Sequence, residues 1–200
     1  MTIKSWIRGL LLVAATTAVA SGSVPRGGGA LANGNFDNDL SGWDNAYNRP
    51  ATWDPLDADG DPASGSVLLG NDMAVGNGGT LTVLSQCFLV SGGETVALGG
   101  HIRVPTGQPF ATGAGVRLAV YSNDDCLTDT LANVYADVLE ADDAWQAVQD
   151  EITLPPLARS MVLALGVKKA IGVTVETHAY FDRVYMVIAG DMIFSDGFEP

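Results

Sequence analysis

The residues of this chain that are best suited to chemistry are aspartates in a segment with loop composition. Eight aspartates lie between Asp37 and Asp72, against a single basic residue, Arg49. Three of them occupy alternate positions, a spacing at which hard oxygen ligands suit Ca²⁺: Asp57, Asp59 and Asp61. The segment is not an EF-hand loop, because its sixth position is Pro62 rather than Gly and its twelfth is Leu68 rather than Glu. We therefore expect either a calcium site or a solvated acidic turn.

A second group of polar side chains lies in two strand-like segments, 95–104 and 115–122. In both segments apolar residues alternate with other residues, and period-2 geometry sends the two sets to opposite faces of a sheet. If the two strands lie in one sheet, one exposed face carries four candidate ligand-binding side chains: His101, Arg103, Arg117 and Tyr121. The alternative is the solvated face of a half-buried sheet.

Residue patterns for catalysis are sparse. The two histidines, His101 and His178, lack the flanking residues of a zinc motif. The sequence has no G-x-S-x-G elbow, P-loop or dinucleotide fingerprint. Paired carboxylates for glycoside hydrolysis stay open, because 23 acidic residues allow many pairs in space. We expect a noncatalytic protein, with a glycoside hydrolase as the less favoured alternative.

The two cysteines fit an oxidising compartment. Cys87 lies in an apolar run, and Cys126 follows a segment with turn composition. We predict a disulfide between them, which the loop-entropy relation values at about 4 kcal/mol. Two free thiols are the alternative, and a catalytic cysteine has no local signature here.

The N-terminus has the form of a signal peptide. Lys4 and Arg8 precede an apolar run, Leu10 to Ala20, that is too short to span a bilayer. Its small-x-small ending predicts a signal peptide over residues 1–20, followed by a linker over 21–32. A second such site predicts an alternative cut after Ala32. No later apolar run approaches 18 residues, so we expect a secreted protein, extracellular or periplasmic, whose mature chain does not insert into the membrane.

Charge and length restrict the partners. The formal net charge is −13, and removing Lys4 and Arg8 takes it to −15, since residues 1–20 hold no acid. Such a chain repels polyanions, so we expect no nucleic-acid partner. The remaining length suits one domain, and we expect a monomer.

The apolar pattern favours a fold made only of strands. Short β-type runs separated by Gly, Asn, Asp and Pro indicate a sandwich or barrel. The runs are 66–69, 80–90, 95–104, 115–122, 145–154, 160–167 and 177–188. One segment, Leu131 to Val148, competes as a helix, but its Asp142-Asp143 pair has turn chemistry. We interpret it as a strand, a loop and a second strand.

Two segments near the ends carry a family resemblance. Asn33 to Trp43 reads NGNFDNDLSGW, and His178 to Val187 reads HAYFDRVYMV. They resemble the opening and closing strands of carbohydrate-binding modules of the family 4 and family 9 type. The resemblance implies an all-β, two-sheet β-sandwich with jelly-roll topology over residues 33–190, and a carbohydrate as ligand. Residues 191–200 form a short C-terminal tail.

The resemblance also implies a structural Ca²⁺. Modules of this type commonly hold one between an acidic residue of the opening motif and an aspartate of the closing motif. The matching positions are Asp37, where the family more often has glutamate, and Asp182. The alternative pairs Asp182 with Arg183, Arg49 or backbone amides.

For a sugar ligand, pyranose C–H faces stack on aromatic rings and hydroxyls pair with polar side chains. Tyr121 would then be the platform, with Arg103 and Arg117 as donors. Trp53, in a segment expected to be a loop, is a second platform candidate, whereas Trp43 and Trp145 match core positions of the family. The remaining alternative to sugar binding is a structural or adhesive sandwich without a ligand groove.

Overall fold

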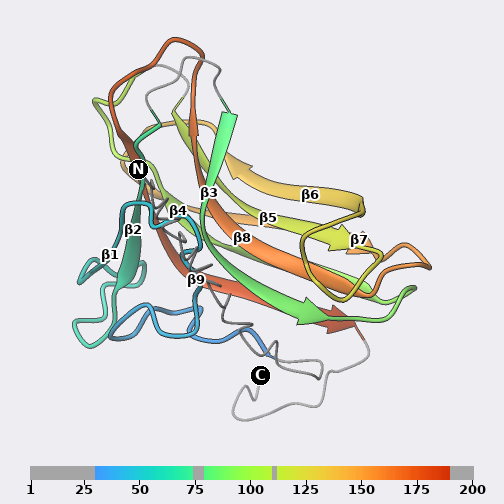
Figure 1. Cartoon of the computed structure of the whole chain (residues 1–200). Coiled ribbons are helices and arrows are strands. Elements are labelled where there is room, and N and C mark those ends of the chain that lie inside the picture. The colour runs from blue at the N-terminus through green and yellow to red at the C-terminus, as the bar shows by residue number, and fades with distance from the viewer. Residues whose placement is uncertain (1–29, 74–78, 110–111, 190–200) are drawn as a thin grey trace, which may run out of the picture.

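The chain folds into two antiparallel β-sheets. The computed structural model describes residues 30–73, 79–109 and 112–189, and these contain nine strands and no helix (Figure 1). The strands are β1 (Ala51–Asp54), β2 (Ser66–Asn71), β3 (Gly79–Leu89), β4 (Thr95–Arg103), β5 (Gly113–Tyr121), β6 (Thr130–Val138), β7 (Trp145–Thr153), β8 (Ser160–Lys169) and β9 (Thr177–Ala189). The predicted all-β, two-sheet sandwich is confirmed. The predicted signal peptide and the C-terminal tail lie outside the described residues.

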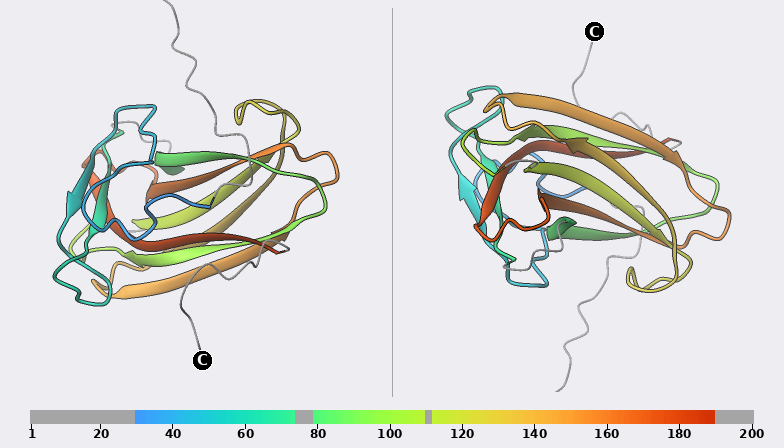
Figure 2. Two further views of the ribbon diagram at one scale, coloured as in Figure 1. Left: turned by 90° about the horizontal axis from the view of Figure 1, so that it is seen from below. Right: turned by 90° about the horizontal axis from the view of Figure 1, so that it is seen from above.

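The two sheets stack as layers (Figure 2). One has five strands in the order β1-β2-β9-β4-β7, and the other has four in the order β3-β8-β5-β6. Consecutive strands β4 and β5 therefore belong to different sheets. No helix among the described residues is long and apolar enough to cross a membrane.

The core lies between the layers because the apolar set of each strand faces inward. In β5 the alternate residues Val116, Leu118 and Val120 are fully buried, opposite the equally buried Leu165, Leu163 and Met161 of β8. The five-stranded sheet adds its own inward residues, such as Leu98 and Ile102 of β4. The alternation in these strands thus sorts their faces as the sequence predicts.

Strand β9 changes its inward parity at an irregularity in the pairing with β4. Ala179 and Phe181 are buried before it, and Val184 and Met186 are buried after it. The register shifts between Gly99 and His101, and Arg183 has a positive φ of 49°. Such a bulge inserts a residue and redirects the side chains that follow. This explains why both parities of the segment are apolar in the sequence.

Two predictions about elements have clear outcomes. The segment 131–148 is a strand, a loop and a second strand, as interpreted, since β6 ends at Val138 and β7 begins at Trp145. The placement of Trp53 in a loop is wrong, because Ala51–Asp54 pairs with β2 as strand β1. Only four residues long, β1 is too short for its alternation to stand out.

Candidate functional site

The predicted single polar surface is divided between the two sheets. His101 and Arg103 lie on β4, which pairs with β7 and β9, whereas Arg117 and Tyr121 lie on β5, which pairs with β6 and β8. The expectation that the four side chains share one face is wrong. His101 and Arg103 are partly exposed on one sheet and Arg117 on the other, so the structure offers two separate outer faces.

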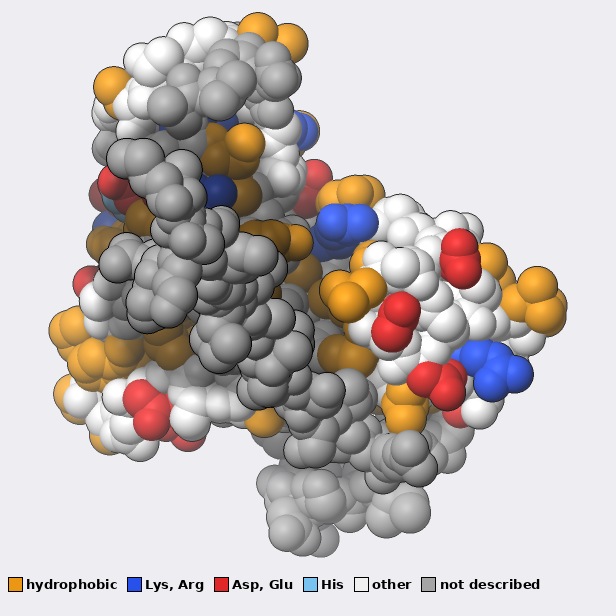
Figure 3. Space-filling view, in the orientation of Figure 1, with side chains coloured by type: hydrophobic (Ala, Val, Ile, Leu, Met, Phe, Trp, Pro, Cys, Tyr) orange, Lys and Arg blue, Asp and Glu red, His pale blue; other side chains and the backbone are white. Residues whose placement is uncertain are grey.

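The outer face of the four-stranded sheet carries a groove of about 360 Å³. We call it the four-strand groove, and its lining residues are Thr80, Thr82, Arg117, Tyr135, Asp137 and Lys168. The register explains the cluster: Arg117 is the partner of Tyr135, and Thr80 is the partner of Lys168. Figure 3 looks onto this side of the molecule, where basic, acidic and hydrophobic side chains are intermixed over β5 and β6.

An exposed tyrosine and an arginine form the centre of the groove. Tyr135 is 46% exposed. The guanidinium carbon of Arg117 lies 5.7 Å from the centroid of its ring, a cation–π distance. The Arg117 Nε–H also donates to Asn133 Oδ1 at 3.0 Å. Because two contacts orient the guanidinium, its remaining N–H groups are held in place as donors.

A carboxylate and an ammonium group complete the groove. Asp137 pairs with Gly115, and a Cβ at Gly115 would collide with the Asp137 carboxylate, so glycine there lets the carboxylate lie against the sheet. Burial raises the pKa of Asp137, and the positive charge of Lys168 opposes that rise. The groove thus presents an acceptor beside several donors, which is the combination that binds hydroxyl groups.

The predicted platform Tyr121 is not available for stacking, because it is only 9% exposed. Sequence reasoning missed Tyr135 as the exposed ring on this face. The alternation that identifies it is present: Asn133, Tyr135 and Asp137 share a parity, while Val134 and Ala136 hold the other.

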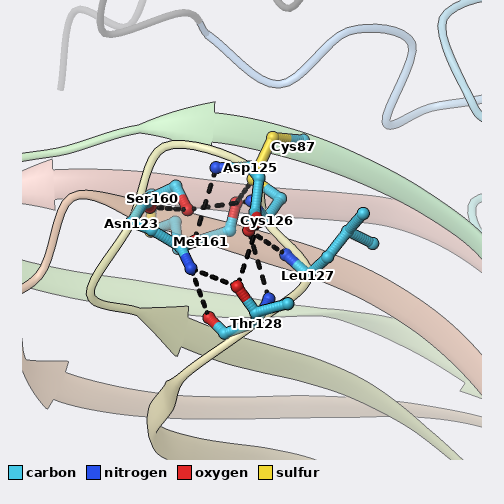
Figure 4. The surroundings of a disulfide bond; sticks show 8 residues. All are labelled: Cys87, Asn123, Asp125, Cys126, Leu127, Thr128, Ser160 and Met161. Carbon is cyan, nitrogen blue, oxygen red and sulfur yellow. Dashed lines mark hydrogen bonds between the residues drawn. A yellow bond between two sulfur atoms is a disulfide. The ribbon is translucent and has the colours of Figure 1, made fainter.

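The loop between β5 and β6 covers one end of the same face, and a disulfide fixes it there (Figure 4). The predicted bond between Cys87 and Cys126 is present, with a Cα–Cα distance of 6.1 Å. The Cys126 amide donates to Ser160 Oγ at 3.2 Å, and that hydroxyl donates to the Asn123 carbonyl at 2.6 Å. The loop therefore forms a fixed boundary of the face.

The outer face of the five-stranded sheet holds a larger hollow of about 590 Å³. We call it the five-strand hollow, and it is lined by Gly100, His101, Ala147, Val148, Gln149, Arg183 and Tyr185. The predicted Arg103 lies outside it: its Nη2 pairs with Asp143 Oδ1 at 2.9 Å, and its guanidinium carbon lies 5.9 Å from the Tyr180 ring centroid. Of the two residues predicted on β4, only His101 lines this hollow.

The tryptophans are mainly structural. Trp53 is half-buried against the core, and its Nε1–H donates to the Phe36 carbonyl at 2.7 Å, which leaves it poorly placed as a platform. Trp43 stacks on Phe36 with ring centroids 5.5 Å apart, as expected for a core position. Trp145 differs from its expected core role, because it lies on the outer side and meets Tyr180 edge-on, with centroids 6.4 Å apart.

The aspartate of the closing motif is buried beneath the acidic loop. Asp182 is fully buried, and its two oxygens accept hydrogen bonds from the Ala58 amide at 2.9 Å and the Arg183 amide at 2.6 Å. Burial raises the pKa of Asp182 to about 6, and the charge of Asp57 adds to the rise. Of the pairing partners expected for Asp182 in place of Ca²⁺, the backbone amides are therefore the ones that contact it.

The other acidic residues have separate partners. Burial acts to raise the pKa of Asp57, but amide bonds from Asp61 and Asp59 together lower it below its usual value. Asp59 pairs with Arg183 at 3.0 Å, and the exposed Asp37 accepts from Ser64 Oγ at 3.3 Å. Among the described residues, no group of three or more His, Cys, Asp or Glu side chains could hold a metal ion.

Comparison with solved structures shows that the fold is similar to that of carbohydrate-binding modules. The sequence matches no protein-family model and no curated protein. Among solved structures, the chain is similar to a family 16 carbohydrate-binding module, with a TM-score of 0.51, 16% identity, and coverage of 78% of this chain and 98% of that one. A xylan-binding family 22 module of Paenibacillus barcinonensis Xyn10C gives a TM-score of 0.52 at 16% identity, covering 82% and 97%.

A third similar structure belongs to a larger protein. The enzymatically active domain of tailspike protein 4 of bacteriophage CBA120 gives a TM-score of 0.55 at 13% identity. The match covers 78% of this chain but 21% of the tailspike chain. These likenesses establish the β-sandwich fold of carbohydrate-binding modules.

Proposed function

We propose that this protein is a noncatalytic carbohydrate-binding module whose binding site is the four-strand groove. Tyr135 provides the ring on which a pyranose stacks, and Arg117 and Lys168 donate hydrogen bonds to its hydroxyls. Asp137 accepts hydrogen bonds from them. The observation that carries the proposal is an exposed, oriented tyrosine surrounded by both donors and an acceptor on a sheet face.

The composition of the groove favours binding over hydrolysis. Glycoside hydrolysis uses two carboxyl groups about 5 to 10 Å apart. Of the six residues that line the groove, Asp137 is the only carboxylate. The third possibility, a sandwich without a ligand groove, is less favoured because Tyr135 and Arg117 form an accessible polar and aromatic surface.

The class of polysaccharide is suggested by the similar structures. One of the similar solved structures is a xylan-binding domain, and another is a complex with xylohexaose. Xylan and xylohexaose are therefore the first probes to use. A neutral, hydroxyl-rich chain also suits a protein with a formal net charge of −13, which disfavours polyanions.

We further propose that Ca²⁺ stabilises the fold at Asp182 and Asp57. The support is a fully buried carboxylate with a second carboxylate near enough to raise its pKa. A cation would offset both the burial and the repulsion. Asp37, Asp59 and Asp61 are the less favoured ligands, because Asp57 is the carboxylate whose charge acts on Asp182.

We also propose that the protein is secreted, with a signal peptide over residues 1–20. The Cys87–Cys126 disulfide supports this, because such bonds persist in oxidising compartments. Mass spectrometry of the mature N-terminus distinguishes the two cleavage sites.

Electrophoresis through gels containing soluble xylan tests the binding proposal. The wild-type protein should be retarded, and Tyr135→Ala should lower the affinity about tenfold, which corresponds to roughly 1.4 kcal/mol. Tyr47→Ala is the matched control, since Tyr47 is 68% exposed and lines neither the groove nor the other outer-face hollow. Equal retardation of the Tyr135 variant and the wild type would refute the assignment.

A further inference from the structure

The five-strand hollow contains an aromatic platform of its own. Tyr185 is 37% exposed, and its ring lies against β4 where that strand has glycine. A Cβ at Gly99 would lie 2.8 Å from a ring carbon of Tyr185 and 2.6 Å from its hydroxyl, closer than side chains approach. Glycine at this position therefore allows the ring to lie low on the sheet, with its other side toward solvent.

Polar groups surround that ring. Gln149 is exposed and is the strand partner of Gly99, and His101 lines the same hollow. The His101 Nδ1 atom is buried and has no hydrogen-bond partner in the described part of the chain. Buried polar atoms generally have partners. A turn of the imidazole ring about its Cβ–Cγ bond would bring this nitrogen into the hollow, where a ligand hydroxyl would satisfy it.

The charges in the hollow favour a neutral ligand. Arg183 is the only charged residue among those that line it, and its guanidinium is paired with Asp59 at 3.0 Å. An anionic ligand would have to compete with that carboxylate. The volume of about 590 Å³ lies within the usual range for small-ligand sites, roughly 300–1,000 Å³.

We propose that the five-strand hollow is a second carbohydrate site, which takes a neutral pyranose residue stacked on Tyr185 with Gln149 and His101 as hydrogen-bonding partners. The inference rests on the proposed function, in that it assigns the same ligand class to the opposite sheet. The two sites lie on the outer sides of layers that stack about 10 Å apart, so they face away from each other. One protein molecule then joins two polysaccharide chains.

Calorimetric titration with xylohexaose tests this inference. The wild-type protein and Tyr47→Ala should each show two binding sites, whereas Tyr185→Ala and Tyr135→Ala should each keep one site unchanged and weaken the other about tenfold. Gln149→Ala, a change at an exposed side chain, should weaken the second site several-fold and guards against a folding defect in Tyr185→Ala. A single site that Tyr135→Ala abolishes and Tyr185→Ala leaves intact would overturn the second site alone.

The other outcomes separate the two proposals. A single site that Tyr185→Ala abolishes and Tyr135→Ala leaves intact would support the hollow and overturn the groove, while no binding by the wild type would overturn both. Light scattering from long soluble xylan measures the joining of chains. The wild type should raise the scattering, and either single-site variant should not, although each still binds xylohexaose.

Discussion

The buried carboxyl group of Asp182 should make the protein less stable as the pH rises from about 4.5 to 7. Its pKa is about 6 in the folded protein against an ordinary value of 3.8. Between these values the folded state keeps a proton that the unfolded state has lost, so stability falls with rising pH. The stabilisation from this retained proton is complete below pH 3.8 and is lost as the pH rises through 6. A difference of about 2 pKa units corresponds to about 3 kcal/mol of unfolding free energy.

The acidic residues with lowered pKa values act in a different window. Asp39, Asp57 and Asp125 each accept backbone amide hydrogen bonds that favour the ionised form. Their stabilisation is present above their ordinary pKa and is lost only as the pH falls below about 4. Burial also raises the pKa of Asp137, so that residue contributes in the same direction as Asp182. The range from pH 4.5 to 7 therefore reports on Asp182 with a smaller contribution from Asp137.

Urea unfolding followed by tryptophan fluorescence, in the presence of a chelator, measures this dependence. Asp182→Asn should remove most of the slope, because an amide does not ionise. At pH 4.5 it should also lower stability by about 1 to 3 kcal/mol, since one of the two amide donors loses its acceptor. This difference from the wild type should shrink as the pH rises, because only the wild type then loses stability through ionisation of Asp182. Asp59→Asn, at an exposed ion pair, is the matched control and should keep the slope.

Calcium gives a second test of the same carboxylate. If Ca²⁺ binds ionised Asp182, saturating calcium should abolish the loss of stability between pH 4.5 and 7 and raise the melting temperature at pH 7. An Asp182→Asn slope equal to that of the wild type would refute the role of this residue. A melting temperature unchanged by calcium would refute the metal proposal.

Three further substitutions test other parts of the account. Replacing Cys87 and Cys126 by serine should lower the unfolding free energy by about 4 kcal/mol in chemical denaturation, and an unchanged midpoint would contradict the role of the bond. Trp53→Phe should cost about 1 kcal/mol by leaving the Phe36 carbonyl without its donor, with retention on xylan unaltered; lost retention would restore Trp53 as a platform. Phe181→Ala should cost about 3 to 5 kcal/mol by opening a cavity between the sheets, which thermal unfolding measures, and a cost below 1 kcal/mol would contradict its core position.

The sequence predicts strands and their faces well where alternation is strong. The inward sets of β4 and β5 follow the pattern of Val96, Leu98, Val116 and Leu118, because a buried face requires apolar side chains at every second position. The disulfide is predicted on other grounds: the chain has only two cysteines, and its signal-peptide pattern indicates an oxidising compartment.

The prediction of one binding face was wrong because such a face depends on which strands pair. His101 and Arg117 have the correct outward parity, but strand pairing is a property of distant segments, and β4 and β5 join different sheets. The bulge at Arg183 cannot be predicted from the sequence either. One parity of β9 is buried before the bulge and the other parity after it, so the apolar pattern does not mark its position. Alternation in the sequence puts Tyr135 on an outer face. Only the structure shows that Tyr135 is exposed and Tyr121 is buried.

Mapping of amide chemical shifts by NMR during a xylohexaose titration tests the central claim most directly. The account predicts saturable shifts at Arg117, Tyr135 and Lys168 and at the strand positions beside them. Tyr135→Ala should remove these shifts while leaving the rest of the spectrum dispersed. Binding that leaves the amides of the four-strand groove unmoved, or no binding at all, would contradict it.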